Sequence, residues 1–204
     1  MPLSDAVRTE VERILRLDLT AAQSRTAHTD AVTTLLNELD CEIAGVIVAA
    51  NGYPGSVISA AVWMDGAAYA NVACALTRHF HAAGWLEPEE AASALWARAT
   101  LAVCAHYRHM VGPAMLANAD CHERLGDTRR AAEMYDAVVK DFECLVNEWD
   151  GLSGSPIEDD RVALESLRTA LQRSLALVPR SRNRKSWSDL LRRTNEILAR
   201  PNSG

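Results

Sequence analysis

The chain has 204 residues, of which 49% are hydrophobic and 24% charged, and its net charge at neutral pH is −6. This length allows one domain with a real core, or at most two small domains. Five cysteines without a C-x-x-C spacing argue against a disulfide framework, and the longest apolar run, 43–50, is far too short to cross a bilayer. We therefore expect a cytoplasmic protein without a signal peptide or a membrane span.

Helix signals recur along the first half of the chain, and no strand signal competes with them. Ser4 is placed to cap a first helix, and a second, long helix is expected from Thr20 to Asn51. The sequence Asn-Gly-Tyr-Pro-Gly at 51–55 predicts a break, after which a third helix runs from 56 to 83 and ends at Gly84. A fourth helix is expected to start near Pro88 and to run up to the Gly-Pro pair at 112–113.

Four more helices are predicted in the second half. A Leu-Gly-Asp turn at 125–127 joins the first two, Ser155 is placed to cap the third, and Ser186 to cap the last. The result is an all-α fold of about eight helices arranged as antiparallel hairpins. We expect one domain, 1–204, composed of N-terminal helices with an apolar middle (1–111), one hairpin (112–149) and a C-terminal hairpin (155–200).

The clearest motif of the chain is the stretch MLANADCHERLGDTRRAAEMYDAVVKDF at 115–142. Small residues at Ala119 and Ala131 allow two helices to approach closely, Gly126 can end the first helix, and Tyr135 lies one turn after Ala131. This pattern resembles one tetratricopeptide (TPR) repeat, most clearly between Gly126 and Tyr135. The positions that depart from the family pattern are Met115, Asn118, His122 and Glu143.

The resemblance implies stacked hairpins in a right-handed α-α superhelix that binds a protein or peptide and performs no catalysis. Four residues would pack the repeat, namely Ala119, Gly126, Ala131 and Tyr135. The inner face of its first helix would present four others to the partner, namely Leu116, Asp120, Glu123 and Arg124. TPR domains that grip acidic chaperone tails carry Lys and Asn where Leu116 and Asp120 stand here, so a basic or apolar peptide is expected.

The residues alone leave two other interpretations open. No Lys or Arg occurs between Arg25 and Arg78, so 26–77 could line the pocket of an α-helical bundle that binds a ligand or catalyses a reaction. The same apolar middle could instead form the interface of a homodimer.

Two groups of His and Cys side chains could contact a metal ion or solvent. Cys104, His106 and His109 could begin a metal site. Small core cysteines beside boundary histidines explain them more simply, so no metal or other cofactor is expected. His79 and His81 are expected to face solvent.

The charge is distributed unevenly along the chain. Residues 1–179 carry a net −11, whereas 180–204 carry +5. The basic segment could contact phosphates, but the acidic remainder would repel nucleic acid, which makes nucleic-acid binding an unfavoured interpretation. We expect the segment to be a solvated connector, or to pack on the acidic surface of its own chain or of a neighbour.

Overall fold

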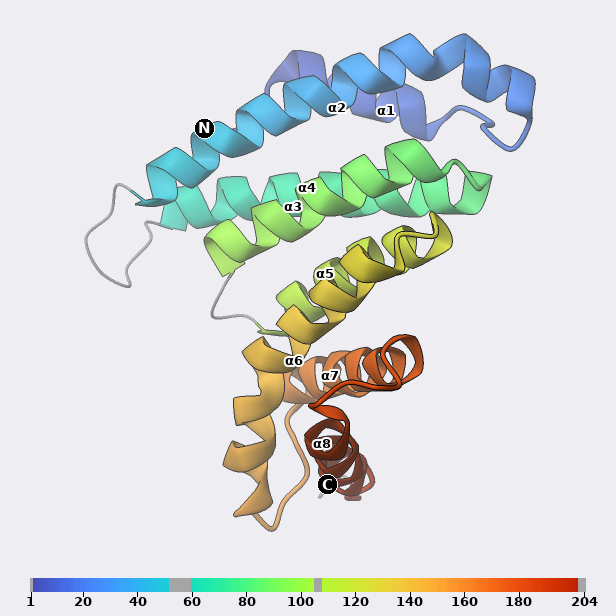
Figure 1. Ribbon diagram of the computed structural model, residues 1–204. Coiled ribbons are helices and arrows are strands. Elements are labelled where there is room, and N and C mark those ends of the chain that lie inside the picture. Colours follow the sequence, from blue (N-terminus) through green and yellow to red (C-terminus); the bar gives the residue numbers. More distant parts are fainter. Residues whose placement is uncertain (1, 52–59, 105–107, 202–204) are drawn as a thin grey trace. The chain divides into compact units, whose positions relative to one another are not determined.

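The computed structural model describes residues 2–51, 60–104 and 108–201, and every regular element in these ranges is an α-helix (Figure 1). The helices are α1 (Asp5–Leu15), α2 (Ala22–Asn51), α3 (Ala60–Ala83), α4 (Leu86–Cys104), α5 (Arg108–Arg124), α6 (Thr128–Asp150), α7 (Glu158–Leu177) and α8 (Arg184–Leu198). For the described part of the chain, the predicted all-α fold of about eight helices is therefore confirmed.

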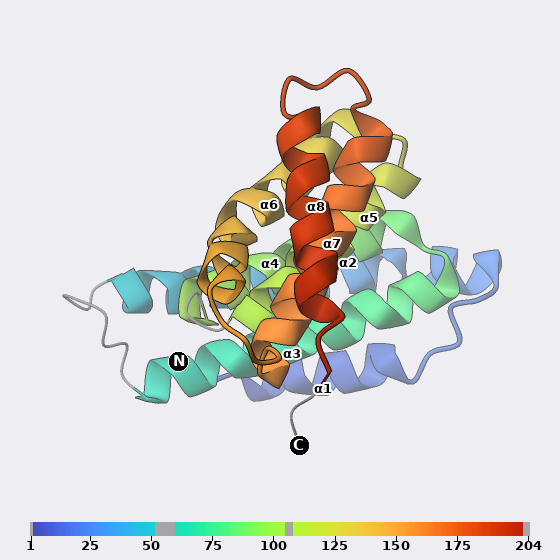
Figure 2. The same ribbon diagram turned by 90° about the horizontal axis from the view of Figure 1, so that it is seen from below.

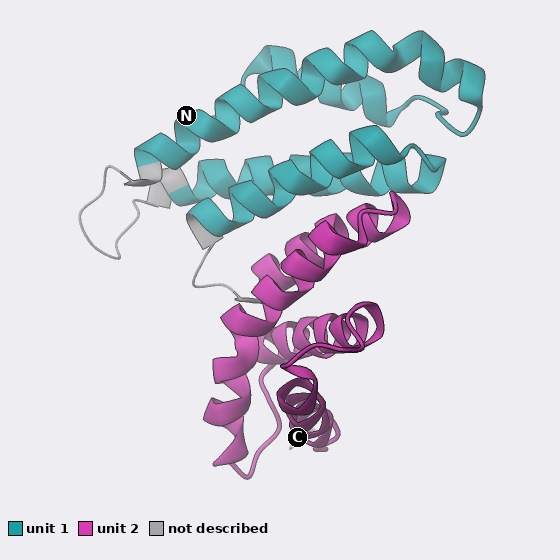
Figure 3. Ribbon diagram, in the orientation of Figure 1, with its two compact units in different colours: residues 1–105 teal, residues 106–204 magenta. Residues whose placement is uncertain are grey.

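The helices group into two compact units, residues 1–105 and 106–204 (Figure 3). The first contains α1 to α4 and is called unit 1, and the second contains α5 to α8 and is called unit 2. Each unit buries its own set of apolar side chains.

Unit 1 is built on the α3–α4 hairpin, with α2 packed against both helices and α1 packed against α2 and α3. Its long α2 contributes Leu35, Leu39 and Ile43, which are at most 1% exposed. The described part of the stretch 26–77, which lacks Lys and Arg, therefore contributes much of the core of unit 1. Arg25 donates a hydrogen bond of 2.7 Å to the carbonyl of Ala83, at the end of α3.

Unit 2 is built on α5, α6 and α7, each of which contacts the other two, and α8 packs against α6 and α7 (Figure 2). Leu164, Leu167 and Leu171 lie at helical spacing on α7 and are buried. One face of α6 is buried and contains Val138, Phe142, Leu145 and Val146, while most of its charged side chains lie on the opposite, exposed face. This division is the amphipathic pattern of a helix that covers a core.

Two similar glycine turns connect the α3–α4 and α5–α6 hairpins. Gly84 and Gly126 have φ values of 63° and 82°, which a residue without Cβ adopts at little cost. The backbone N–H of the residue after each glycine donates a hydrogen bond to a carbonyl in the last turn of the preceding helix. Trp85 donates to Phe80, and Asp127 donates to His122. Both turns are therefore Schellman motifs, which satisfy carbonyls that the helix leaves unpaired.

Several predicted helix starts can be compared with the structure. Ser4 caps α1 by accepting a hydrogen bond from the backbone of Val7, and Asp127 caps α6 by accepting one from Arg130. Ser155 does not cap α7, because the helix begins at Glu158 with Ile157 at the cap position. The Ser155 hydroxyl donates to the carbonyl of Pro201. The cap predicted at Ser186 is also wrong, since α8 already begins at Arg184.

The boundary between the fourth and fifth helices also differs from the prediction. We expected the Gly112-Pro113 pair to separate them, but α4 ends at Cys104 and α5 begins at Arg108, with Pro113 inside the helix. Val111 and Ala114 on either side of the pair are buried. Tertiary packing therefore keeps α5 helical across Pro113, although a proline by itself favours a helix boundary. The predicted break at 52–55 and the predicted start at 56 lie outside the described residues.

Candidate functional site

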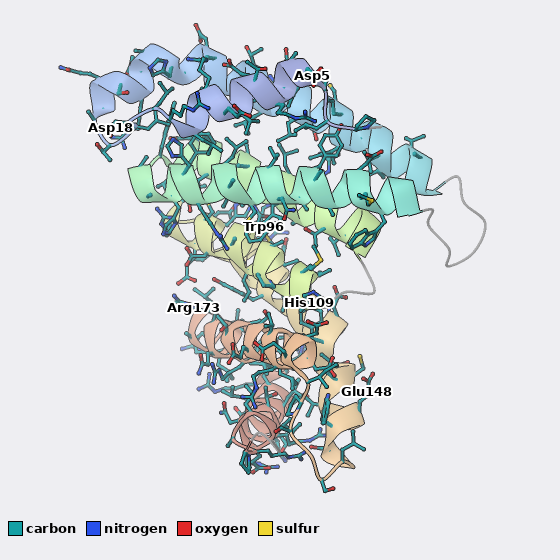
Figure 4. All side chains as sticks on the ribbon, turned by 180° about the vertical axis from the view of Figure 1, so that it is seen from behind. Asp5, Asp18, Trp96, His109, Glu148 and Arg173 are labelled. Carbon is teal, nitrogen blue, oxygen red and sulfur yellow. The ribbon has the colours of Figure 1, made fainter. Side chains whose placement is uncertain are left out.

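Two contacts between polar side chains join α5 to α7 at matching ends of the two helices. His109 Nδ1 lies 3.5 Å from Asp159 Oδ2 near the N-terminal ends, and Glu123 Oε1 lies 3.4 Å from Arg173 Nη1 near the C-terminal ends. His109 and Arg173 are labelled in Figure 4. Helices linked in this way must run in the same direction, so α5 and α7 are parallel neighbours and α6 returns between them.

The two helices approach each other most closely at Gly112. A Cβ atom placed there would lie 2.6 Å from Ser166 Cβ on α7 and 2.8 Å from Phe142 Cε2 on α6. Side-chain carbons in packed interiors are normally about 3.5–4.0 Å apart. The contact between α5 and α7 therefore depends on the absence of a side chain at this position.

A polar cluster lies where α5, α6 and α7 meet near the ion pair of Glu123. Tyr135 is 1% exposed, and its hydroxyl donates a hydrogen bond of 3.1 Å to Glu123 Oε2. Burial raises the pKa of Tyr135, and the negative charge of Glu123 raises it further. Tyr135 therefore remains protonated and donates to Glu123, whose other oxygen faces Arg173.

The residues predicted to face a partner lie on this part of α5. Leu116, Asp120 and Glu123 follow one another at helical spacing and are half-buried, while Arg124 is exposed. Leu116 packs against the core of unit 2, and the charge of Asp120 acts on Tyr135. The sequence did not point to Arg173, because 50 residues separate it from Glu123 and no local pattern connects them.

The residues predicted to pack the repeat lie at the α5–α6 contact. Ala119 and Ala131 are fully buried, Tyr135 lies in the cluster described above, and Gly126 has the left-handed backbone that the turn requires. His122, where the motif departs from the family pattern, is also 6% exposed and thus belongs to the interior.

Of the three residues that could begin a metal site, His106 and the side chain of Cys104 lie outside the described residues, and His109 Nδ1 lies 3.5 Å from Asp159 Oδ2. Within the described ranges, no group of three or more His, Cys, Asp or Glu side chains is placed to hold a metal ion.

The histidines of α3 have different environments. His81 is exposed, as expected, and its Nδ1 lies 2.8 Å from Glu89 Oε1, a carboxylate that is 2% exposed. The expectation that His79 faces solvent is wrong, because its Nε2 atom is buried and its ring is hydrogen-bonded to the backbone of Ile14. Burial lowers the pKa of His79, and the bond to Ile14 partly opposes this shift.

The basic C-terminal segment divides into two parts. Arg193 forms an ion pair with Asp150 and donates to Asn147 Oδ1 at 2.8 Å, and Arg200 donates to the carbonyl of Trp149 at 2.9 Å. These contacts lie at the C-terminal end of α6 and agree with the expectation that the segment packs on its own acidic surface. The cations around the α7–α8 turn are exposed instead.

Unit 1 offers one shallow surface groove between α1 and α2, with Asn37, Cys41 and Glu42 on its wall. Near the end of α2, Val48 is 72% exposed, and Met64 near the start of α3 is 65% exposed. Among the described helices, none has a stretch long and apolar enough to traverse a lipid bilayer.

The chain was compared with known proteins in three ways. Neither the protein-family models, nor the curated proteins, nor the solved structures include one that matches it.

Proposed function

We propose that unit 2 is a TPR-like interaction module that binds a protein or peptide segment along the face shared by α5 and α7. The observation that carries this proposal is the parallel pairing of α5 and α7, with α6 packed against both. In stacked helical hairpins, the first helices of successive hairpins are expected to lie side by side in this way. The α7–α8 pair then takes the place of the second hairpin.

The chemistry of this face favours a segment that combines basic and apolar side chains. Asp120 and Glu123 place two carboxylates one helical turn apart, and Leu116 adds apolar surface one turn earlier. Half-buried carboxylates attract Lys or Arg more strongly than fully solvated ones, because less water screens them. Arg173 balances only one of the two negative charges.

The proposal is tested with fluorescently labelled peptides of equal length that are basic and apolar, acidic, or uncharged. The double variant Asp120→Asn/Glu123→Gln removes both charges but keeps an oxygen that can accept from Tyr135. We expect the basic peptide to bind best, and its affinity to fall about tenfold or more in this variant. A tenfold fall corresponds to a loss of only about 1.4 kcal/mol in binding free energy.

The matched control is Asp30→Asn, which makes the same chemical change at an exposed position of α2 in unit 1. It should bind the basic peptide like the wild-type protein. Equal affinity of wild type and double variant, or a preference for the acidic peptide, contradicts the assignment of this face.

A further inference from the structure

Unit 2 separates its charges along the sequence. Residues 133–165 contain ten acidic and two basic side chains, a net charge of −8, whereas residues 168–200 contain two acidic and nine basic ones, a net charge of +7. Charge segregation on this scale within one packed unit produces a strong and directional field.

The fold places six exposed cations at one end of unit 2. Because α5 and α7 are parallel and joined through Glu123 and Arg173, the α5–α6 turn and the α7–α8 turn lie at the same end (Figures 1 and 2). The exposed basic residues at these turns, here called the basic end, are Arg129, Arg130, Arg180, Arg182, Arg184 and Lys185.

Five exposed carboxylates gather at the opposite end. They lie on the second half of α6 and the start of α7, on both sides of the α6–α7 connection, and Glu148 marks this region in Figure 4. The acidic end is defined by Asp141, Glu143, Glu148, Glu158 and Asp159. Along α6 (Thr128–Asp150) the nearest members of the two sets, Arg130 and Asp141, are 11 residues or about 17 Å apart, too far to form a direct ion pair within one molecule.

We propose that unit 2 associates head to tail with a second copy of this chain, the basic end of one copy lying on the acidic end of the next. The partner is inferred from charge complementarity, because the chain itself carries the anionic surface that its basic end requires. Arginine predominates at the basic end, and its planar guanidinium group can bind a carboxylate through two hydrogen bonds.

A nucleic-acid partner is less favoured. The net charge of the whole chain is −6, and Trp187, the aromatic residue nearest to the basic turn in sequence, is only 7% exposed, so it offers no surface for stacking on bases. The proposed contact involves residues other than those of the α5–α7 face, so either proposal can fail without the other.

The geometry of this contact makes it heterologous, since two different surfaces meet. Such contacts do not close by themselves into a dimer, and each added copy offers a new free end. Because both ends are exposed, the contact should be sensitive to salt, whose screening distance falls from about 10 Å at about 0.1 M to about 3 Å at about 1 M.

The test measures the mass of the full chain in solution by sedimentation velocity at low and high salt. Two charge-reversal variants are compared with the wild type, Arg180→Glu/Arg182→Glu at the basic end and Glu143→Lys/Glu148→Lys at the acidic end. Wild type should exceed twice the monomer mass at low salt and return to the monomer at high salt, and each variant alone should stay monomeric.

The decisive measurement is the equimolar mixture of the two variants. The native end of each variant is complementary to that of the other, and so are the two reversed ends, so the mixture should exceed the mass of one chain although neither variant does so alone. A wild type that is monomeric at low salt, or variants that still self-associate, overturns the proposal. Binding of a short DNA duplex to monomeric wild type, lost in Arg180→Glu/Arg182→Glu, overturns it in favour of a polyanion partner.

Discussion

Replacing Gly112 by alanine tests whether the close contact of α5 with α7 holds unit 2 together. In an exposed helix this change would stabilise the protein by about 1 kcal/mol, because alanine has the higher helix propensity. Here the new methyl group would meet Ser166 Cβ at 2.6 Å and Phe142 Cε2 at 2.8 Å. The Ser166 atom is attached directly to the backbone of α7, so it cannot rotate away, and the helices must separate.

Overpacking of a well-packed interior costs about 1–3 kcal/mol. We place Gly112→Ala near the upper limit, since Ser166 Oγ would also lie at 2.5 Å. After subtraction of the gain in helix propensity of about 1 kcal/mol, the free energy of unfolding should fall by about 2 kcal/mol. For a chain of this length, the melting temperature should fall by about 4–8 °C.

The assay is urea unfolding followed by circular dichroism, with Gly151→Ala as the matched control. Gly151 ends α6 with φ −82°, and a Cβ atom there would meet nothing within 4 Å, so its replacement should leave stability unchanged or slightly raised. The double variant Gly112→Ala/Ser166→Gly should lose less stability than the sum of its single changes. If Gly112→Ala is as stable as the wild type, the close contact does not exist in solution.

Three further results are expected. Tyr135→Phe removes the hydrogen bond to the half-buried Glu123 and should lower the free energy of unfolding by about 1 kcal/mol in urea titrations; an unchanged value would mean that the bond contributes nothing. Because burial lowers the pKa of His79 below 6.5 in the folded state, the unfolded chain binds the proton more readily, so stability should fall as the pH drops below 6.5, and His79→Gln should flatten this dependence in unfolding curves across that range. Gly126→Ala forces a side chain into a left-handed backbone without creating a clash, so it should lower the melting temperature by the equivalent of about 1 kcal/mol, and a loss of several times that would indicate a second role for the turn.

Local patterns in the sequence were enough to predict much of the secondary structure. Apolar residues recur at helical spacing on α1 (Val7, Val11 and Ile14) and on α7 (Leu164, Leu167 and Leu171), and all six are buried. Gly84 ends α3 as expected, and Gly126 lies in the turn after α5. These features depend on residues within a few turns of one another, so a single sequence contains the information that determines them.

Other features depend on contacts between distant residues, and the sequence did not reveal them. Pro113 suggested a boundary, but the packing of Val111 and of Gly112 on α7 keeps the helix continuous. His79 was expected in solvent because its partner, the backbone of Ile14, belongs to another helix. Ser155 was expected to cap α7, but the helix begins only at Glu158, and the Ser155 hydroxyl donates to the carbonyl of Pro201, 46 residues away.

The Schellman turn at Gly126 also bears on the order in which unit 2 folds. It connects α5 to α6 over a few residues, so the first contacts between these helices close only a small loop. Closing a small loop costs little chain entropy. The contact of Gly112 with Ser166 has to close a loop that includes all of α6, and we expect it to form later, after the main folding barrier. Substitution at Gly126 should then slow folding, whereas substitution at Gly112 should chiefly accelerate unfolding and so shorten the lifetime of the folded unit.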